Sequence, residues 1–85
     1  MIGVYILCFN NGYNYIGSSV NIEKRLKRHR YELRVRNKQW YKYCDAQLIN
    51  LKVIPTKTIE EARIMEMLLI QNSNCKLYNK QYVVN

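Results

Sequence analysis

The start of the sequence constrains the fold most, because two strand-like runs there are separated by a strong turn signal. Val4 to Phe9 is an apolar run rich in β-branched and aromatic residues, which is typical of a buried strand. Asn10-Asn11-Gly12 follows it, and both residue types accept the positive φ that a tight turn needs. Tyr13 to Gly17 is then the expected partner strand of a hairpin. This hairpin places Tyr5 and Tyr15 on neighbouring strands, although the sequence leaves open the register that decides whether they share a face.

The residues after the hairpin predict a basic helix. Asn21 is the best-placed N-cap, and the helix is expected from Ile22 to about Arg36. Its apolar stripe has a four-three-four spacing, which brings His29 onto or beside the buried face. Arg25 lies one turn before His29, on the flank of the same face. The stripe consists of Ile22, Leu26, His29 and Leu33.

The second half of the chain predicts a third strand and a second long helix. Leu48 to Ile54 is strand-like and is ended by Pro55, which cannot donate to a β-ladder. Thr58 is the expected N-cap of a helix that runs to about Asn72, with Glu61 as its capping-box partner.

The remaining two segments have weaker signals, and the length of the chain predicts a single domain. Residues 39–47 are rich in aromatic side chains and are consistent with a short helix, whereas the tail 76–85 is expected to be irregular or to form a final short strand. The sequence shows no internal repeat, linker or low-complexity tract. With 85 residues, the chain is expected to form one domain, 1–85, with one modest core.

The charge of the chain favours a nucleic-acid partner. The net charge is +8, from 14 Lys and Arg against 6 Asp and Glu, and eight of the basic residues fall between Lys24 and Lys38. Such a cluster releases counterions from phosphates when it binds DNA or RNA. An acidic membrane surface or simple solubility would also explain the charge, but the many aromatic residues add weight to nucleic acid.

Nothing in the sequence suggests export or membrane insertion. The apolar run 1–9 is too short for a signal peptide and lacks a basic start. No stretch approaches the roughly 20 apolar residues of a membrane span. The cysteines Cys8, Cys44 and Cys75 have no CxxC pairing and support neither a zinc site nor a disulfide framework, which fits a reducing compartment. The expected location is intracellular, in the cytoplasm or, for a viral protein, in the host cytoplasm.

Four side chains of the hairpin and the first helix are candidates for chemistry. If the hydroxyls of Tyr5 and Tyr15 converge, one of them can hold or activate a water. Because an unperturbed tyrosine has a pKa of about 10, acting as a base would require a nearby cation. Arg25 offers a planar fork for a phosphate, and His29 could donate to a phosphate or orient a tyrosine. The plainer interpretation is that the tyrosines and the histidine fill the core and that the arginine belongs to a solvated face.

Glu66 is the most informative carboxylate. Its neighbours one helical turn away, Ala62 and Ile70, are apolar, as is Leu69. A carboxylate in such a place must be paired, protonated or bound to a metal. The alternative is an ion pair with Arg63 that reaches water. The carboxylates of the sequence are compatible with one Mg²⁺ that is held by one carboxylate, waters and a substrate phosphate. A two-metal site is not supported, because no second carboxylate pairs clearly with Glu66.

These motifs resemble the signature of the GIY-YIG nuclease superfamily. Gly3-Val4-Tyr5 and Tyr15-Ile16-Gly17 correspond to the two halves of that signature, with Val4 in place of the usual isoleucine. The places that follow the signature are occupied by Ser18, Arg25 and His29.

The resemblance extends over essentially the whole chain. Residues 63–70 resemble the segment that carries the family's metal-binding glutamate, here Glu66. Residues 76–79 resemble the closing motif with its asparagine, here Asn79. The implied fold is an α/β (α+β) domain with a small three-stranded antiparallel sheet flanked by helices, in agreement with the elements above.

The resemblance also implies a function and a set of site residues. The chain is expected to be a DNA endonuclease that hydrolyses phosphodiester bonds with a single divalent cation, Mg²⁺ or Mn²⁺, bound by Glu66. The tyrosines would position or deprotonate the attacking water, the arginine would bind the phosphate, and the histidine and asparagine would support the site. The implied catalytic residues are Tyr5, Tyr15, Arg25, His29, Glu66 and Asn79.

Contacts to DNA are expected from the basic helix and from the residues before it. Gly17 lacks a Cβ, which would let a phosphate or a neighbouring backbone approach closely. The expected DNA-binding residues are Gly17, Ser18, Lys24, Lys27, Arg28, Arg34 and Lys38. With one small domain, sequence specificity should be low unless a homodimer, a protein partner or DNA shape supplies it. The Asn-, Lys-, Ile- and Tyr-rich composition fits an AT-rich genome such as that of a phage or mobile element.

Two other functions stay open at this point. A catalytically silent basic nucleic-acid-binding module would bind DNA equally well but never cut it. An accessory protein whose basic patch meets an acidic partner would show no salt-dependent DNA binding.

Overall fold

The computed structural model describes residues 1–36, 44, 46–74 and 76–81. In chain order the elements are β1 (Gly3–Phe9), β2 (Tyr13–Ser19), α1 (Ile22–Val35), β3 (Leu48–Pro55), α2 (Ile59–Asn72), β4 (Lys76–Leu77) and α3 (Tyr78–Gln81). The expected hairpin, third strand and two long helices are confirmed, with ends that differ from the prediction by one or two residues. The short helix expected at 39–47 falls mostly outside the described residues. No helix in the described part of the chain is both long and apolar enough to cross a membrane.

The sheet has four strands in the order β3-β1-β2-β4, and the prediction of three strands was wrong by one. β1 pairs antiparallel with β2 and with β3, whereas β4 pairs parallel with the start of β2, at Tyr13 and Asn14. A strand of two residues is too short to show any periodicity, so the prediction for the tail 76–85 is either irregular structure or a final short strand, which was not counted in the sheet. On the side of β2 away from β1, no strand among the described residues pairs with β2 beyond Asn14, so this part of the sheet edge is open.

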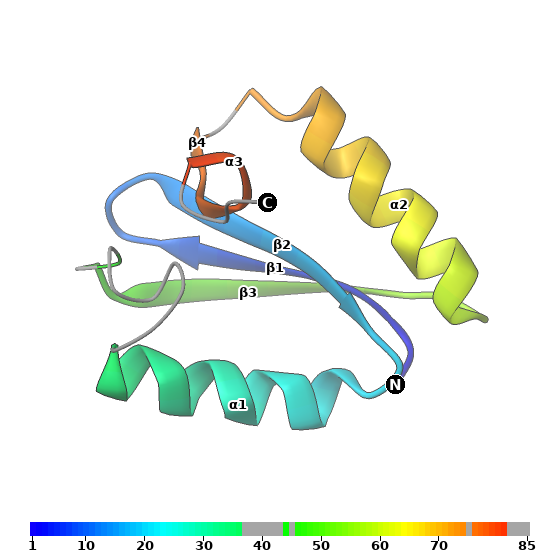
Figure 1. Cartoon of the computed structure of the whole chain (residues 1–85), viewed down its shortest axis with the longest axis horizontal. Coiled ribbons are helices and arrows are strands. Elements are labelled where there is room, and N and C mark those ends of the chain that lie inside the picture. Colours follow the sequence, from blue (N-terminus) through cyan, green and yellow to red (C-terminus); the bar gives the residue numbers. More distant parts are fainter. Residues whose placement is uncertain (37–43, 45, 75, 82–85) are drawn as a thin grey trace.

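The two long helices lie on opposite faces of the sheet (Figure 1). Tyr5 is opposite Gly17, and side chains alternate along each strand, so Tyr5, Tyr15 and Gly17 belong to one face. Ile16 and Ser18 belong to the other face. The core on the α1 side contains Tyr5, Leu7, Phe9, Ile22, Leu33, Cys44, Ala46 and Tyr78. The core on the α2 side contains Val4, Ile16, Ala62 and Leu77.

Side-chain caps begin both long helices, as the sequence predicts. Oδ1 of Asn21 accepts a hydrogen bond from the backbone N–H of Lys24 at 3.1 Å. Thr58 and Glu61 form the reciprocal hydrogen bonds of a capping box at the start of α2. These local hydrogen bonds fix where each helix leaves the sheet, and thereby which side chains each helix presents to it.

Arg36 ends α1 and belongs to the fold even though it is part of the basic cluster. Its φ of 56° is left-handed, which closes the helix. Its guanidinium donates hydrogen bonds to the carbonyl oxygens of Leu33, Cys44 and Ala46. Arg36 therefore holds Cys44 and Ala46 against the end of α1.

Candidate active site

The polar centre of the α1 face is a hydrogen bond between Tyr5 and His29. The hydroxyl of Tyr5 lies 2.7 Å from Nε2 of His29, and both side chains are buried. Burial, and then the charges of Arg25 and Arg28, lower the pKa of His29 to about 4. His29 is therefore neutral near pH 7, so Nε2 can accept a hydrogen bond from the Tyr5 hydroxyl.

Tyr15 completes a cluster of three rings. Its ring centroid lies 5.3 Å from that of His29 and 6.5 Å from that of Tyr5. Tyr15 is only half-buried, whereas Tyr5 is fully buried. The sequence left open whether the two tyrosines share a face, and the register of β1 with β2 brings them together.

Gly17 is required by the packing of Tyr5. A Cβ built on Gly17 would lie 2.5 Å from Cζ of Tyr5, far inside normal contact distance. A side chain at this position would displace the Tyr5 ring and with it the hydroxyl that meets His29. The absence of a Cβ thus serves the tyrosine, and the expected contact of Gly17 with DNA stays a prediction.

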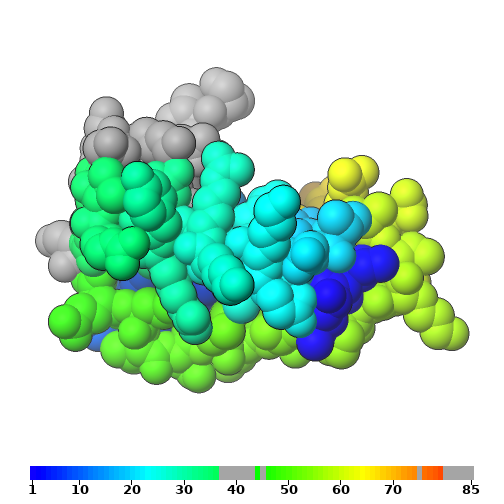
Figure 2. Space-filling model, turned by 90° about the horizontal axis from the view of Figure 1, so that it is seen from below, coloured from blue at the N-terminus to red at the C-terminus, as the bar shows by residue number. Residues whose placement is uncertain are grey.

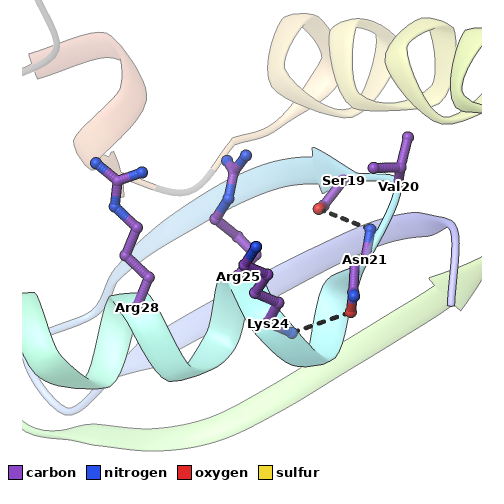
Figure 3. Close-up of a pocket in the computed structure, with 6 residues that line it drawn as sticks. All are labelled: Ser19, Val20, Asn21, Lys24, Arg25 and Arg28. Atoms are coloured by element: carbon purple, nitrogen blue, oxygen red, sulfur yellow. Dashed lines mark hydrogen bonds between the residues drawn. The ribbon is translucent and has the colours of Figure 1, made fainter.

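Arg25 lines a pocket of about 330 Å³ at the start of α1 (Figure 3). Its side chain is exposed and extends, like that of Arg28, from the flank of α1 toward the side of β2. The residues that line this pocket are Ser19, Val20, Asn21, Lys24, Arg25 and Arg28. Three cations beside the beginning of a helix create a positive potential that suits a phosphate.

The remaining basic residues of α1 lie on its other flank. Lys27, Arg30 and Arg34 are spaced by three and four residues and so follow one side of the helix. Arg30 and Arg34 line a second pocket of about 370 Å³ together with Leu48 of β3. Figure 2 looks onto this face, where the side chains of α1 cover the middle and β3 runs along one side. The predicted DNA-binding residues of α1 are therefore divided between its two flanks. Gly17 and Ser18 lie on β2 instead, and Lys38 lies outside the described residues.

Glu66 lies on the α2 side of the sheet. It is half-buried and accepts a short hydrogen bond from Oγ of Ser18 on β2. The alternative partner, Arg63, is exposed, and no ion pair joins it to Glu66 in the described structure. Sequence reasoning named both Ser18 and Glu66 but missed that they are partners, because no local signal indicates which strand α2 covers.

Asn79 closes part of the open edge of β2. Its side-chain oxygen accepts a hydrogen bond from the backbone N–H of Ile16 at 2.9 Å, and its amide nitrogen donates to the carbonyl of Ile16 at 2.7 Å. The side-chain amide thus replaces the backbone of a neighbouring strand at one residue. Asn79 thereby fixes the start of α3 beside β2.

The candidate residues consequently meet around the edge of β2 and not on one face of the sheet. Tyr5, Tyr15 and His29 are in direct contact on the α1 side. Glu66 reaches the same strand from the α2 side through Ser18. Among the described residues no group of three or more His, Cys, Asp or Glu side chains comes together.

Comparison with known proteins identifies the family. Residues 1–79 match the family model described as the GIY-YIG catalytic domain. Searches among curated proteins and among solved structures gave no significant match. The match covers 79 of 85 residues and includes both tyrosine motifs, the basic helix, Glu66 and Asn79, so the chain belongs to the GIY-YIG family.

Proposed function

We propose that this chain is a metal-dependent DNA endonuclease of low intrinsic sequence specificity. GIY-YIG domains are usually endonucleases and generally use divalent metal ions, so membership of the family supports a nuclease-type function. The observation that carries the proposal is the buried hydrogen bond between Tyr5 and His29 beside the half-buried Tyr15. A structural core would be served equally well by apolar rings, whereas tyrosine hydroxyls and an imidazole at one place can position a water or take part in proton transfer during hydrolysis.

The tyrosines would act on the attacking water. Tyr15 is the better candidate for direct contact with water, because Tyr5 is fully buried and its hydroxyl is held by His29. A hydroxyl in this position can orient the water in line with the phosphorus atom. Since His29 is neutral, its Nε2 can accept a hydrogen bond from the Tyr5 hydroxyl and hold that hydroxyl in a fixed orientation.

Arg25 would bind the scissile phosphate. Its exposed guanidinium lies in the basic pocket with Lys24 and Arg28, where it can form paired hydrogen bonds with two phosphate oxygens. Hydrolysis increases the negative charge on these oxygens in the transition state, so preorganised cations lower the barrier.

Glu66 would hold a single Mg²⁺ or Mn²⁺ ion. Mg²⁺ is commonly bound by one or two carboxylates together with waters and substrate phosphates, which fits a lone carboxylate at the rim of the sheet. The chemistry that such an ion supplies when bound is stabilisation of negative charge on the phosphate and the leaving oxygen. Glu66 would thus act on the side of the phosphate that faces α2, and the tyrosines on the side that faces α1.

Specificity for a DNA sequence should be low. The basic residues of α1 are long, flexible side chains that suit phosphate contacts, which carry no sequence information directly. A homodimer or a protein partner would be needed for a long recognition site. Cleavage of several unrelated plasmids at many positions is the expected result.

The test is incubation of supercoiled plasmid with the purified chain in Mg²⁺ or in EDTA. Wild type should nick or linearise the plasmid only with the metal, and Glu66→Ala and Arg25→Ala should both lose this activity. DNA binding without any cutting by wild type would overturn the proposal in favour of a catalytically silent binding module. Cutting that persists in Glu66→Ala would remove Glu66 from the role of metal ligand.

A further inference from the structure

We propose that Ser18 is a positioning residue for Glu66, an inference that rests on the proposed metal-dependent function. The hydroxyl of Ser18 would hold one carboxylate oxygen of Glu66 and leave the other oxygen free to bind a cation. The resemblance to the family provides no such role for Ser18, and the sequence pattern suggested a DNA contact instead.

The first argument is the place of Ser18 in the sheet. It lies opposite Val4 in the β1–β2 ladder, so its side chain projects toward α2, away from the tyrosines. Its Oγ donates to Oε1 of Glu66, which is 48 residues further along the chain. Packing of α2 on the sheet is thus what brings the hydroxyl and the carboxylate together.

The second argument is the surroundings of Glu66. Ala62 is buried one turn before it, and Leu69 and Ile70 pack against the apolar core of the α2 face. These side chains provide no hydrogen bond. Ser18 is the hydrogen-bond partner that the described structure gives to the Glu66 side chain. Because a carboxylate rotates freely about its last bonds, this contact selects one orientation of the group.

The third argument concerns the proton of the hydroxyl. A serine hydroxyl has one hydrogen to donate, and here it is donated to Glu66. Phosphate oxygens of DNA only accept hydrogen bonds, so a direct contact between the Ser18 hydroxyl and DNA would require the bond to Glu66 to break. The geometry therefore favours positioning of the carboxylate over contact with the substrate.

The experiment is a titration of the purified full chain with Mn²⁺ alone, followed by the electron paramagnetic resonance signal of free Mn²⁺. Ser18→Ala should weaken Mn²⁺ binding by about tenfold, the lower end of the effect of losing a partner of a metal ligand. Ser18→Thr, which keeps the hydroxyl in a β-branched residue suited to a strand, should restore binding. In a Glu66→Gln background, Ser18→Ala should have no further effect. Affinity for a DNA duplex in EDTA should be equal for wild type and Ser18→Ala.

Several results would overturn the inference. One is unchanged Mn²⁺ binding by Ser18→Ala, and another is an equal loss in the Glu66→Gln background. Weaker DNA binding in EDTA, with Mn²⁺ binding unchanged, would make Ser18 a DNA contact. Wild type that shows no Glu66-dependent Mn²⁺ binding would also overturn it. By contrast, Ser18-dependent Mn²⁺ binding in a chain that never cuts DNA would refute the proposed function and leave the positioning role intact. Thermal unfolding in EDTA verifies that each variant is folded.

Discussion

The two faces of the sheet use polar groups in opposite ways. On the α1 face, Tyr5 and His29 are buried in the core and hydrogen-bonded to each other. On the α2 face the buried core is aliphatic, and the pair of Ser18 and Glu66 lies at its half-buried rim. Side chains proposed for catalysis on the α1 face therefore also stabilise the fold. On the α2 face, the side chains proposed for catalysis are different from those that form the core. This contrast predicts which variants lose activity alone and which lose stability as well.

The largest effect is expected from Glu66→Gln, which keeps the shape of the side chain and removes its charge. Cleavage at saturating Mg²⁺ should fall by about 10²-fold or more, because stabilisation of the transition-state charge is lost. The free energy of unfolding should change by no more than about 0.5 kcal/mol, since the group lies at the rim. Single-turnover cleavage measures the first quantity, and urea unfolding measures the second.

The matched control is Glu60→Gln, which changes an exposed residue in the first turn of the same helix. This variant should cleave DNA like wild type. A clear loss of stability in Glu66→Gln would show that the proposed catalytic residues of the α2 face also stabilise the fold, as those of the α1 face do.

Acid should weaken the α1 face. The pKa of His29 is about 4 in the folded chain against 6.5 for an unperturbed histidine, so the unfolded chain binds more protons between these values. The contribution of neutral, buried His29 to the free energy of unfolding is fully present above about pH 6.5. It is lost as the pH falls toward 4, for a total of about 3 kcal/mol. Urea unfolding between pH 7.5 and pH 4 tests this. His29→Gln, which cannot titrate, should show a flatter dependence, and an unchanged slope would assign the acid sensitivity to other groups.

Gly17→Ala should be costly because its Cβ would enter the space of the Tyr5 ring. The expected loss of unfolding free energy is about 1–3 kcal/mol, typical of an overpacked core. The control is the other glycine of the hairpin, Gly12, which has a φ of 87° and open space around its Cβ position. Gly12→Asn should be nearly neutral, because asparagine tolerates positive φ. Equal stability of Gly17→Ala and wild type would mean that the Tyr5 ring can move aside at little cost.

The smallest effect separates the two flanks of α1. The double variant Lys27→Ala/Arg34→Ala removes cations from the β3 side, away from the tyrosine cluster. DNA affinity should fall several-fold, and the slope of log K against log salt should decrease by about 2, while cleavage at saturating DNA is unchanged. Lys24→Ala/Arg28→Ala removes two cations from the pocket of Arg25 and should also slow cleavage at saturating DNA. If the two double variants had the same DNA affinity and the same cleavage rate, the two flanks of α1 would not differ in function.

The parts of the fold that follow from local chemistry could be predicted from the sequence. The hairpin follows from Asn10-Asn11-Gly12, and the helix starts follow from the caps Asn21 and Thr58, which form their hydrogen bonds within three residues. The burial of His29 followed from helical periodicity in the same way. A short strand was one of two alternatives for the tail, but the pairing of β4 with β2 could not be predicted. Its two residues have no pattern of their own and pair only once α2 has returned the chain to β2.

The site was predictable in its residues but not in its arrangement. Whether Tyr5 and Tyr15 share a face depends on a register that a shift of one residue would reverse. The hydrogen bond from Ser18 to Glu66 joins residues 48 apart and depends on how α2 packs on the sheet. Gly17 was expected to let a phosphate or a neighbouring backbone approach, and the sequence did not indicate that the Tyr5 ring packs against it. In each case the deciding contact is long-range, and no local propensity encodes it.

The most direct test of the central claim compares one variant from each side of the β2 edge. Tyr15→Phe removes a hydroxyl on the α1 side, and Glu66→Gln removes a charge on the α2 side. Each is assayed for Mg²⁺-dependent cleavage of supercoiled plasmid and for DNA binding in EDTA. We predict that each variant alone loses cleavage while binding DNA as wild type does, because both sides act on one phosphate. Near-normal cleavage by either variant would contradict this account and restrict the chemistry to a single face of the sheet.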